Sequence, residues 1–180
     1  MKIILRFVLL AVLTGAGIWL WTIFFPSPER IIRQRLDEVA KYASFTASES
    51  SLARLGSAQS LAGYFSTNVE VIIDLGEEGR HVLNGRDQIA QAALAARSEL
   101  GSLSVTFLDV DVTVASGKQS ATADLTVDAN VSGQQNAIVQ EVKINLQKIS
   151  GQWLITRAET IRTLSILNFE LRPPAFIVKA

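Results

Sequence analysis

Ala121-Thr122-Ala123-Asp124-Leu125-Thr126-Val127-Asp128-Ala129 alternates small or apolar residues with polar ones without interruption. A period of two is typical of a β-strand with one face buried and the other in solvent. A second alternating run covers residues 141–147, and the pairs Ser132-Gly133 and Ser150-Gly151 supply turn residues between the runs. The second half of the chain therefore predicts long antiparallel strands joined by tight turns, the last of them over residues 152–163.

The strand before this stretch carries a change of phase. Leu103, Val105 and Phe107 alternate with polar residues, but from Leu108 onward the apolar residues occupy the other set of positions, through to Val114. A shift of one residue within a period-two pattern predicts a β-bulge, which bends the sheet. The turn that follows is predicted at residues 116–118.

The first half of the chain has helical spacing. Apolar residues three and four apart predict helices over residues 29–44 and 48–64, and Ser27 and Pro28 supply a cap and a first-turn proline for the first helix. A short hairpin is predicted over residues 68–75 and 80–83. A third helix follows from Asn84-Gly85, and we expect Gly101 to end it in a left-handed conformation. This order predicts an α+β fold, with three helices packed on a curved antiparallel sheet that forms a cone with an apolar interior.

Residues 7–25 are 19 consecutive uncharged and mostly apolar residues. As a helix they span roughly 28 Å, close to the hydrocarbon thickness of a bilayer. A cleaved signal peptide and a buried helix are the alternatives, but the run is longer than a signal peptide needs, and large apolar residues follow its only small-residue cluster. We therefore expect residues 1–25 to be a transmembrane anchor, residues 26–28 a stiff linker, residues 29–163 one domain, and residues 164–180 a C-terminal extension.

The charges around the apolar run predict its orientation. Lys2 and Arg6 precede it with no acidic residue beside them, which favours a cytoplasmic N-terminus and a C-terminal domain outside the cytoplasm at the inner membrane. Arg30, Arg33 and Arg35 follow the run and weaken this preference. Trp and Phe residues at its far end suit the aromatic belt of a membrane interface.

The composition excludes several classes of function. Beyond residue 28 the chain holds 15 Lys and Arg against 17 Asp and Glu, so it lacks the basic surface that nucleic acids require. The absence of cysteine excludes disulfides, thiol catalysis, Cys-ligated zinc and a lipid-modified cysteine anchor. His81 is the single histidine, which excludes a metal centre of several histidines. We expect no cofactor and no metal.

Three local motifs in this order carry a resemblance to a known superfamily. They are residues 61–69, which lead from the second helix into the first strand, residues 84–89, which open the third helix, and residues 151–155, which open the last strand. From about Glu29 to Thr163 the chain resembles the nuclear transport factor 2-like superfamily, which includes SnoaL-like proteins and ketosteroid isomerase. The resemblance implies a cystatin-like cone. It does not imply one function, because the superfamily holds enzymes, carriers and binding modules.

The resemblance also indicates where isomerase chemistry would reside. In ketosteroid isomerase-like members the general base is a carboxylate on the first strand, a place that falls here at Ile73 or Asp74. The second carboxylic acid, on the penultimate strand, falls at Ile144 or Asn145. This chain therefore lacks one of the two acids, and the resemblance does not support that reaction.

Asp74 and His81 are the two catalytic candidates. Asp74 follows three apolar residues, where burial would raise the pKa of its carboxyl, and His81 would lie across the hairpin as a general base. The alternative is an exposed Asp at the end of a strand and an exposed His beside a turn. Asp109, Asp111, Asp124 and Asp128 alternate with apolar residues, which predicts a solvated face, with Lys143 and Lys148 as partners, rather than a metal site.

The cone interior gives a predicted pocket. Tyr42 and Tyr64 would donate hydrogen bonds into it, or pack at the edge of the core with their hydroxyls in solvent. The other predicted lining residues are Phe65, Ile73, Phe107, Ile144 and Trp153. A small apolar ligand would suit such a pocket.

The C-terminal extension is interrupted by Pro173-Pro174, which cannot continue a central strand. It would either pack on its own domain or extend to a partner, a second subunit or the membrane. We expect a membrane-anchored, extracytoplasmic binding or scaffold domain without catalysis, whose partner is an envelope protein or a second copy in a homodimer. The alternative is a tethered enzyme or carrier for a small apolar molecule.

Overall fold

The computed structural model describes residues 27–74, 79–132 and 137–165. The predicted anchor at residues 1–25, most of the first hairpin turn and the tail from residue 166 lie outside the described residues. The described elements are α2 (Pro28–Ala43), α3 (Ser51–Ala62), β1 (Phe65–Asp74), β2 (Arg80–Asn84), α4 (Arg86–Glu99), β3 (Leu103–Val114), β4 (Ser120–Val131), β5 (Ile138–Ile149) and β6 (Gln152–Ser165). Within the described ranges, no helix has the length and apolar character to cross a membrane.

The helix boundaries follow from capping residues. Ser27 accepts a hydrogen bond from the amide of Arg30 at the start of α2, as predicted, and Ser50 caps α3 in the same way. The prediction that a left-handed Gly101 ends α4 was wrong. The helix ends at Glu99 because Leu100 adopts an extended conformation, and Gly101 has no positive φ.

Gly85, in the motif that opens α4, has a backbone conformation that favours glycine. Its φ is +82°, and a Cβ atom there would lie 3.3 Å from the carbonyl oxygen of Thr67. The amide of Gly85 donates to the carbonyl of Val69 over 2.7 Å, which holds the start of α4 against β1. The glycine thus allows the chain to turn tightly from β2 into α4.

The sheet is mixed, which corrects the prediction of an antiparallel one. Its strand order is β2-β1-β6-β5-β4-β3, and β1 pairs with β6 in parallel, while every other pair is antiparallel. Tight turns force antiparallel pairing between consecutive strands. β1 and β6 are separated by five other elements of the described chain, so no turn between them sets their relative direction.

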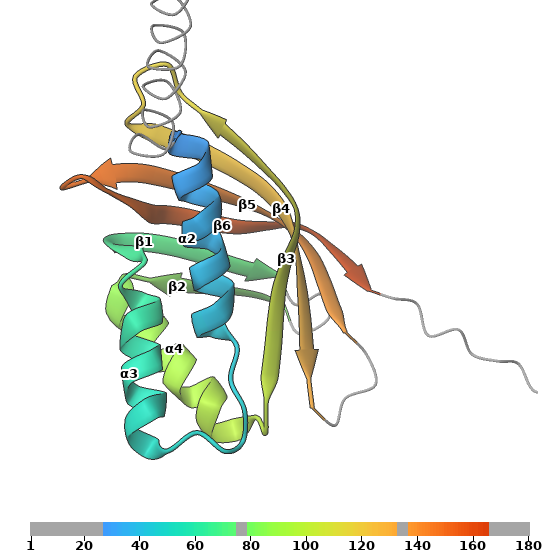
Figure 1. Ribbon diagram of the computed structural model, residues 1–180. Helices are drawn as coiled ribbons and strands as arrows, with labels where there is room; N and C mark the ends of the chain where they lie inside the picture. The colour runs from blue at the N-terminus through green and yellow to red at the C-terminus, as the bar shows by residue number, and fades with distance from the viewer. Residues whose placement is uncertain (1–26, 75–78, 133–136, 166–180) are drawn as a thin grey trace, which may run out of the picture.

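The predicted bulge in β3 is confirmed. The pairing of β3 with β4 shifts register between Leu108 and Asp111, and Asp109 has a φ of +50°. Figure 1 shows the sheet bending so that its strands curl around one side of α2. Bulges increase the local twist and bend of a strand, and this one produces the change of phase seen in the sequence.

The core lies between α2 and the concave side of the sheet (Figure 1). Ile32 and Leu36 of α2 are fully buried against it. The alternation of the opening stretch is confirmed, since Ala121, Ala123 and Leu125 are buried whereas Asp124 is exposed. α3 and α4 pack side by side below α2, at the end of the domain opposite the start of α2 (Figure 1).

Candidate functional site

The interior of the cone is filled by side chains. Trp153 is 3% exposed and Ile144 is 4% exposed, and both belong to the central apolar cluster, as does Phe65. A narrow void remains beneath Tyr64, but it is too small to admit a water molecule. The residues around that void are Arg35, Leu36, Val39, Tyr64, Leu146, Trp153 and Ile155.

An open cleft of about 520 Å³ lies directly outside this void and shares Arg35 and Tyr64 with it. Arg35, Glu38 and Tyr42 line the cleft from one face of α2, because residues three and four apart on a helix are neighbours. Tyr64 enters from the turn after α3. β6 fixes this turn, since the amide of Ile155 donates to the Tyr64 carbonyl over 2.9 Å.

The polar groups of this cleft form a connected set, which we call the tyrosine cleft (Arg35, Glu38, Tyr42 and Tyr64). The Tyr64 hydroxyl donates to Oε2 of Glu38 over 2.9 Å. The guanidinium of Arg35 lies 5.5 Å from the centre of the Tyr64 ring, within cation–π range, and the Tyr42 ring centre lies 5.8 Å from that of Tyr64.

Partial burial is the main cause that raises the pKa of Tyr64, to about 12, and the hydrogen bond to Glu38 adds to it. Tyr64 is therefore a neutral hydrogen-bond donor at physiological pH, not a base. The cleft offers a cation, a carboxylate and two aromatic rings, which suits binding of a polar or aromatic group.

The sequence predicted Tyr42 and Tyr64 at a pocket inside the cone, whereas the structure places both at this surface cleft, and the sequence missed Arg35 and Glu38. The available signal was that Arg35 lies seven residues and Glu38 four residues before Tyr42, which places all three on one helical face. The Tyr64 hydroxyl is bonded to Glu38, not directed only to solvent as the simpler alternative predicted.

The structure does not bring Asp74 and His81 together. Asp74 pairs with Arg80, while His81 pairs with Ile73. Residues that are directly opposite each other share a face and successive residues alternate, so Asp74 and His81 lie on opposite faces of the hairpin. Both are exposed, and neither lines the tyrosine cleft.

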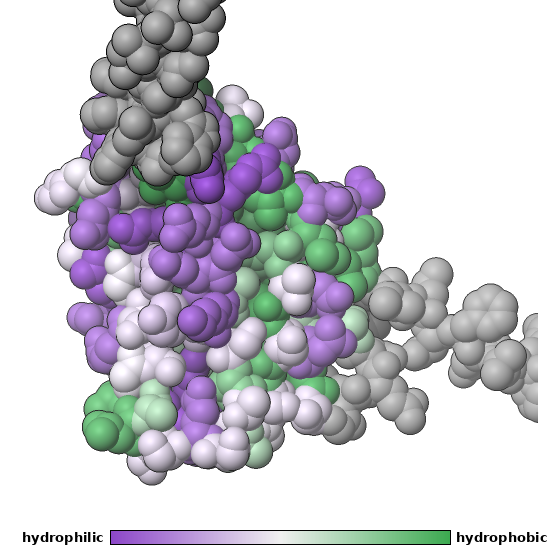
Figure 2. Space-filling model, viewed as in Figure 1, coloured by the Kyte–Doolittle hydropathy of each residue, from purple (hydrophilic) through white to green (hydrophobic). Residues whose placement is uncertain are grey.

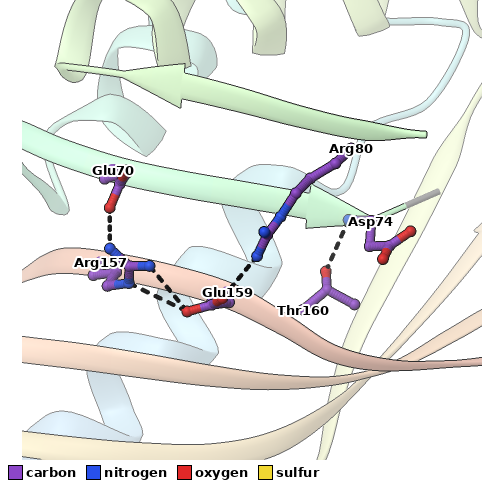
Figure 3. A network of polar contacts seen from close by, with 6 residues as sticks. All are labelled: Glu70, Asp74, Arg80, Arg157, Glu159 and Thr160. Atoms are coloured by element: carbon purple, nitrogen blue, oxygen red, sulfur yellow. Dashed lines mark hydrogen bonds and ion pairs between the residues drawn. The ribbon is translucent and has the colours of Figure 1, made fainter. Parts of the chain in front are cut away.

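Asp74 belongs to a polar region on the face of the sheet away from α2 (Figure 3). Its amide donates to Oγ1 of Thr160 over 3.4 Å. Its carbonyl accepts from Nε2 of Gln140 over 2.7 Å and from Oγ1 of Thr163 over 3.1 Å. These side chains from β5 and β6 hold the end of β1 beyond the last β1–β6 backbone pair.

Ion pairs cover the rest of this face near β1 (Figure 3). Arg157 binds Glu70 and also Glu159, the latter over 3.0 Å, and Arg80 binds Glu159 over 2.8 Å. The hydrogen bonds to Glu159 are the main cause that raises the pKa of Arg157. All of these groups are partly exposed, so the network fixes strand positions more than it adds stability.

The remaining predicted residues have structural surroundings. Ile73 and Phe107 are half-buried, and Phe107 packs against the central cluster. Lys143 pairs with Asp124 over 3.7 Å, as the alternation predicted. In the described ranges, His, Asp and Glu residues form no group suited to a metal ion.

Two further hollows lie on the surface. The larger, about 590 Å³, is a hydroxyl-rich groove between the α2–α3 connection and the ends of β3 and β4. Glu49 on its wall lies 3.6 Å from Nε of Arg97, a residue only 2% exposed. The smaller, about 350 Å³, lies on β4 and β5 around Thr122 and Asn145.

Comparison with known proteins identifies the fold. No protein-family model matches the chain, and no curated protein matches it. Among solved structures, a domain of unknown function with a cystatin-like fold from Nostoc punctiforme is 19% identical, with a TM-score of 0.59, covering 79% of this chain and 81% of that one.

Two other structures agree with this one. An NTF2-like protein of unknown function from Pseudomonas putida is 11% identical, with a TM-score of 0.58, covering 77% of this chain and 94% of that one. A candidate scytalone dehydratase from Novosphingobium aromaticivorans is 17% identical, with a TM-score of 0.55, covering 75% and 83%. The chain therefore has the α+β cystatin-like cone fold of NTF2-like proteins.

Proposed function

We propose that this protein is a non-catalytic binding module, held at the outer face of the inner membrane by residues 7–25. The observation that carries the proposal is the filled interior beneath Tyr64, where the void admits no water molecule. An enzyme or carrier that holds a small apolar molecule inside the cone needs a pocket of a few hundred Å³ there. A module that binds through its surface needs only a packed core.

The surface offers an apolar patch for a protein partner. Leu52 is 80% exposed and Leu55 is 48% exposed on the first turns of α3. Figure 2 shows hydrophobic side chains gathered there, at the end of the domain opposite the start of α2. An envelope protein or a second copy of the chain is the partner class that we propose for it.

Titration with an apolar fluorescent probe tests whether the interior of the domain can hold a small apolar molecule. The wild-type chain should not bind the probe in its interior. Leu36→Ala should bind it, because removal of a fully buried side chain leaves an apolar cavity. Tight stoichiometric binding by wild type, abolished by Leu36→Trp, would instead support a carrier.

The tyrosine cleft favours a second candidate, a tethered enzyme or carrier for a small molecule. Tyr64 would donate a hydrogen bond, and Arg35 and Glu38 would orient a polar substituent at the cleft while its apolar part entered the cone. Entry would require Tyr64 to move, since its side chain borders both the cleft and the void. Ligand binding or turnover that Tyr64→Phe weakens and Tyr42→Phe leaves unchanged would favour this candidate.

A further inference from the structure

Four basic side chains lie around the start of α2, and we call them the basic end (Arg30, Arg33, Lys118 and Lys148). Figure 1 shows the turn between β3 and β4, which carries Lys118, beside the first turn of α2. The amide of Lys148 donates to the carbonyl of Gln119 over 2.8 Å. The end of β5 is therefore adjacent to the same turn.

Glu29 is a carboxylate beside this group. The pKa of Glu29 is lowered mainly by its own backbone amide, then by the Ser27 hydroxyl, and Lys118 contributes a further attraction. The four cations of the basic end are exposed. They therefore outnumber the carboxylate of Glu29 at the start of α2.

Some cations elsewhere on the domain are paired with carboxylates, whereas others, such as Lys41 and Arg162, are not. Lys143 has Asp124 as its partner, and both Arg80 and Arg157 bind Glu159. Across the described residues, no member of the basic end lies within 4.0 Å of a carboxylate. Ile149, next to Lys148, is also 40% exposed. The guanidinium of Arg33 donates to the carbonyl of Val110. Exposed cations without a carboxylate partner, beside an exposed apolar side chain, suit the headgroup region of an anionic bilayer.

The basic end lies close in the chain to the apolar run, which favours a lipid surface as its partner. Ser27 begins the described residues and caps α2 beside Lys118, and the apolar run ends only two residues earlier, at Phe25. We propose that the basic end docks on anionic phospholipid headgroups and fixes the domain's orientation at the membrane. This inference rests on the proposed tether of residues 7–25.

A probe in the β3–β4 turn tests the docking in the full chain. The chain has no cysteine, so Ser116→Cys can carry a single environment-sensitive dye. The labelled protein is reconstituted in vesicles of phosphatidylcholine alone or of phosphatidylcholine with phosphatidylglycerol. Lys118→Gln/Lys148→Gln removes two charges of the basic end, and Lys143→Gln/Arg162→Gln removes two exposed charges elsewhere as the matched control.

The dye emission should shift to the blue only with phosphatidylglycerol, and high salt should reverse the shift. The Lys118/Lys148 variant should lower the ratio of docked to undocked domain about 25-fold, at about fivefold per lysine, and the control should match wild type. Flotation measures the tether separately. A chain that does not float with phosphatidylcholine vesicles overturns the tether. A chain that floats with an unresponsive dye, or whose control loses the shift equally, overturns the docking alone.

Discussion

At the scale of single residues, the Tyr64–Glu38 hydrogen bond connects the core to the cleft. Neither residue type in isolation indicated this contact, since Tyr64 comes from the turn after α3 and Glu38 from the middle of α2. Sequence spacing predicted which residues share a face of α2. It could not predict which turn would fold against that face, because the contact spans 26 residues.

Tyr64→Phe should change how stability depends on alkaline pH. An unfolded tyrosine titrates near pH 10, whereas folding raises the pKa of Tyr64 to about 12. The folded state thus holds this proton more tightly, so its contribution to stability is full below about pH 10 and is lost as the pH rises towards 12.

Urea unfolding at several pH values measures this effect. The difference in unfolding free energy between wild type and Tyr64→Phe should be about 1 kcal/mol near pH 7 and should shrink above pH 10. Tyr42→Phe serves as the control, and it should not reproduce this change with pH. If the unfolding free energies of wild type and Tyr64→Phe changed in parallel with pH, a raised pKa of Tyr64 in the folded state would be contradicted.

Arg97 is a second residue whose role is visible only in the fold. It is 2% exposed, and its guanidinium donates to the carbonyls of Ala93 and Tyr42 and lies 5.0 Å from the ring of Phe45. The charge costs solvation, and burial lowers the pKa of Arg97. Its hydrogen bonds to Ala93 and Tyr42 connect α4 to the end of α2.

Arg97→Ala should destabilise the domain by about 3 kcal/mol, since it leaves the carbonyl of Tyr42 and the carboxylate of Glu49 without this cation. Arg97→Lys should recover little, because lysine lacks the planar donor fork. Arg30→Ala, at an exposed site, should stay within about 0.5 kcal/mol of wild type. Chemical denaturation measures all three, and a loss for Arg97→Ala as small as for Arg30→Ala would refute this structural role.

At the scale of elements, the sequence predicted most of what is local. The Ser27 cap of α2, the helical spacing and the phase change in β3 each act within a few residues, and each predicted its element correctly, whereas the predicted glycine cap of α4 was wrong. The parallel pairing of β1 with β6 was missed because strand direction depends on the path of the whole chain. The separation of Asp74 from His81 was missed for a related reason, since hairpin register decides which residues share a face.

The bulge in β3 can be tested at Asp109, whose φ is +50°. Asp109→Val should destabilise the domain by about 1–2 kcal/mol, because a β-branched residue is strained in the left-handed region. Asp109→Gly should be neutral or stabilising. The matched control is Asp111→Val, which removes a carboxylate that faces Asp124 in a regular part of the strand and should not destabilise. Thermal unfolding in which both Val variants behave alike would contradict the bulge.

At the scale of the whole molecule, the domain combines a packed interior with two distinct ends. The basic end surrounds the start of α2, and the apolar patch of Leu52 and Leu55 lies at the far end (Figure 1). The proposed tether would lie at one end and the proposed partner at the other, which is the arrangement expected of a binding module at a membrane. The fold alone does not distinguish this from an enzyme, since the cystatin-like cone serves both.

The filled interior is therefore the feature on which the proposed function depends. Xenon enters apolar cavities in protein crystals and marks space that a small apolar ligand could occupy. We predict no xenon site between Leu36 and Trp153 in the wild-type domain, and a new site there in Leu36→Ala. An occupied xenon site at this place in the wild-type protein would contradict the binding-module proposal and favour a carrier or an enzyme.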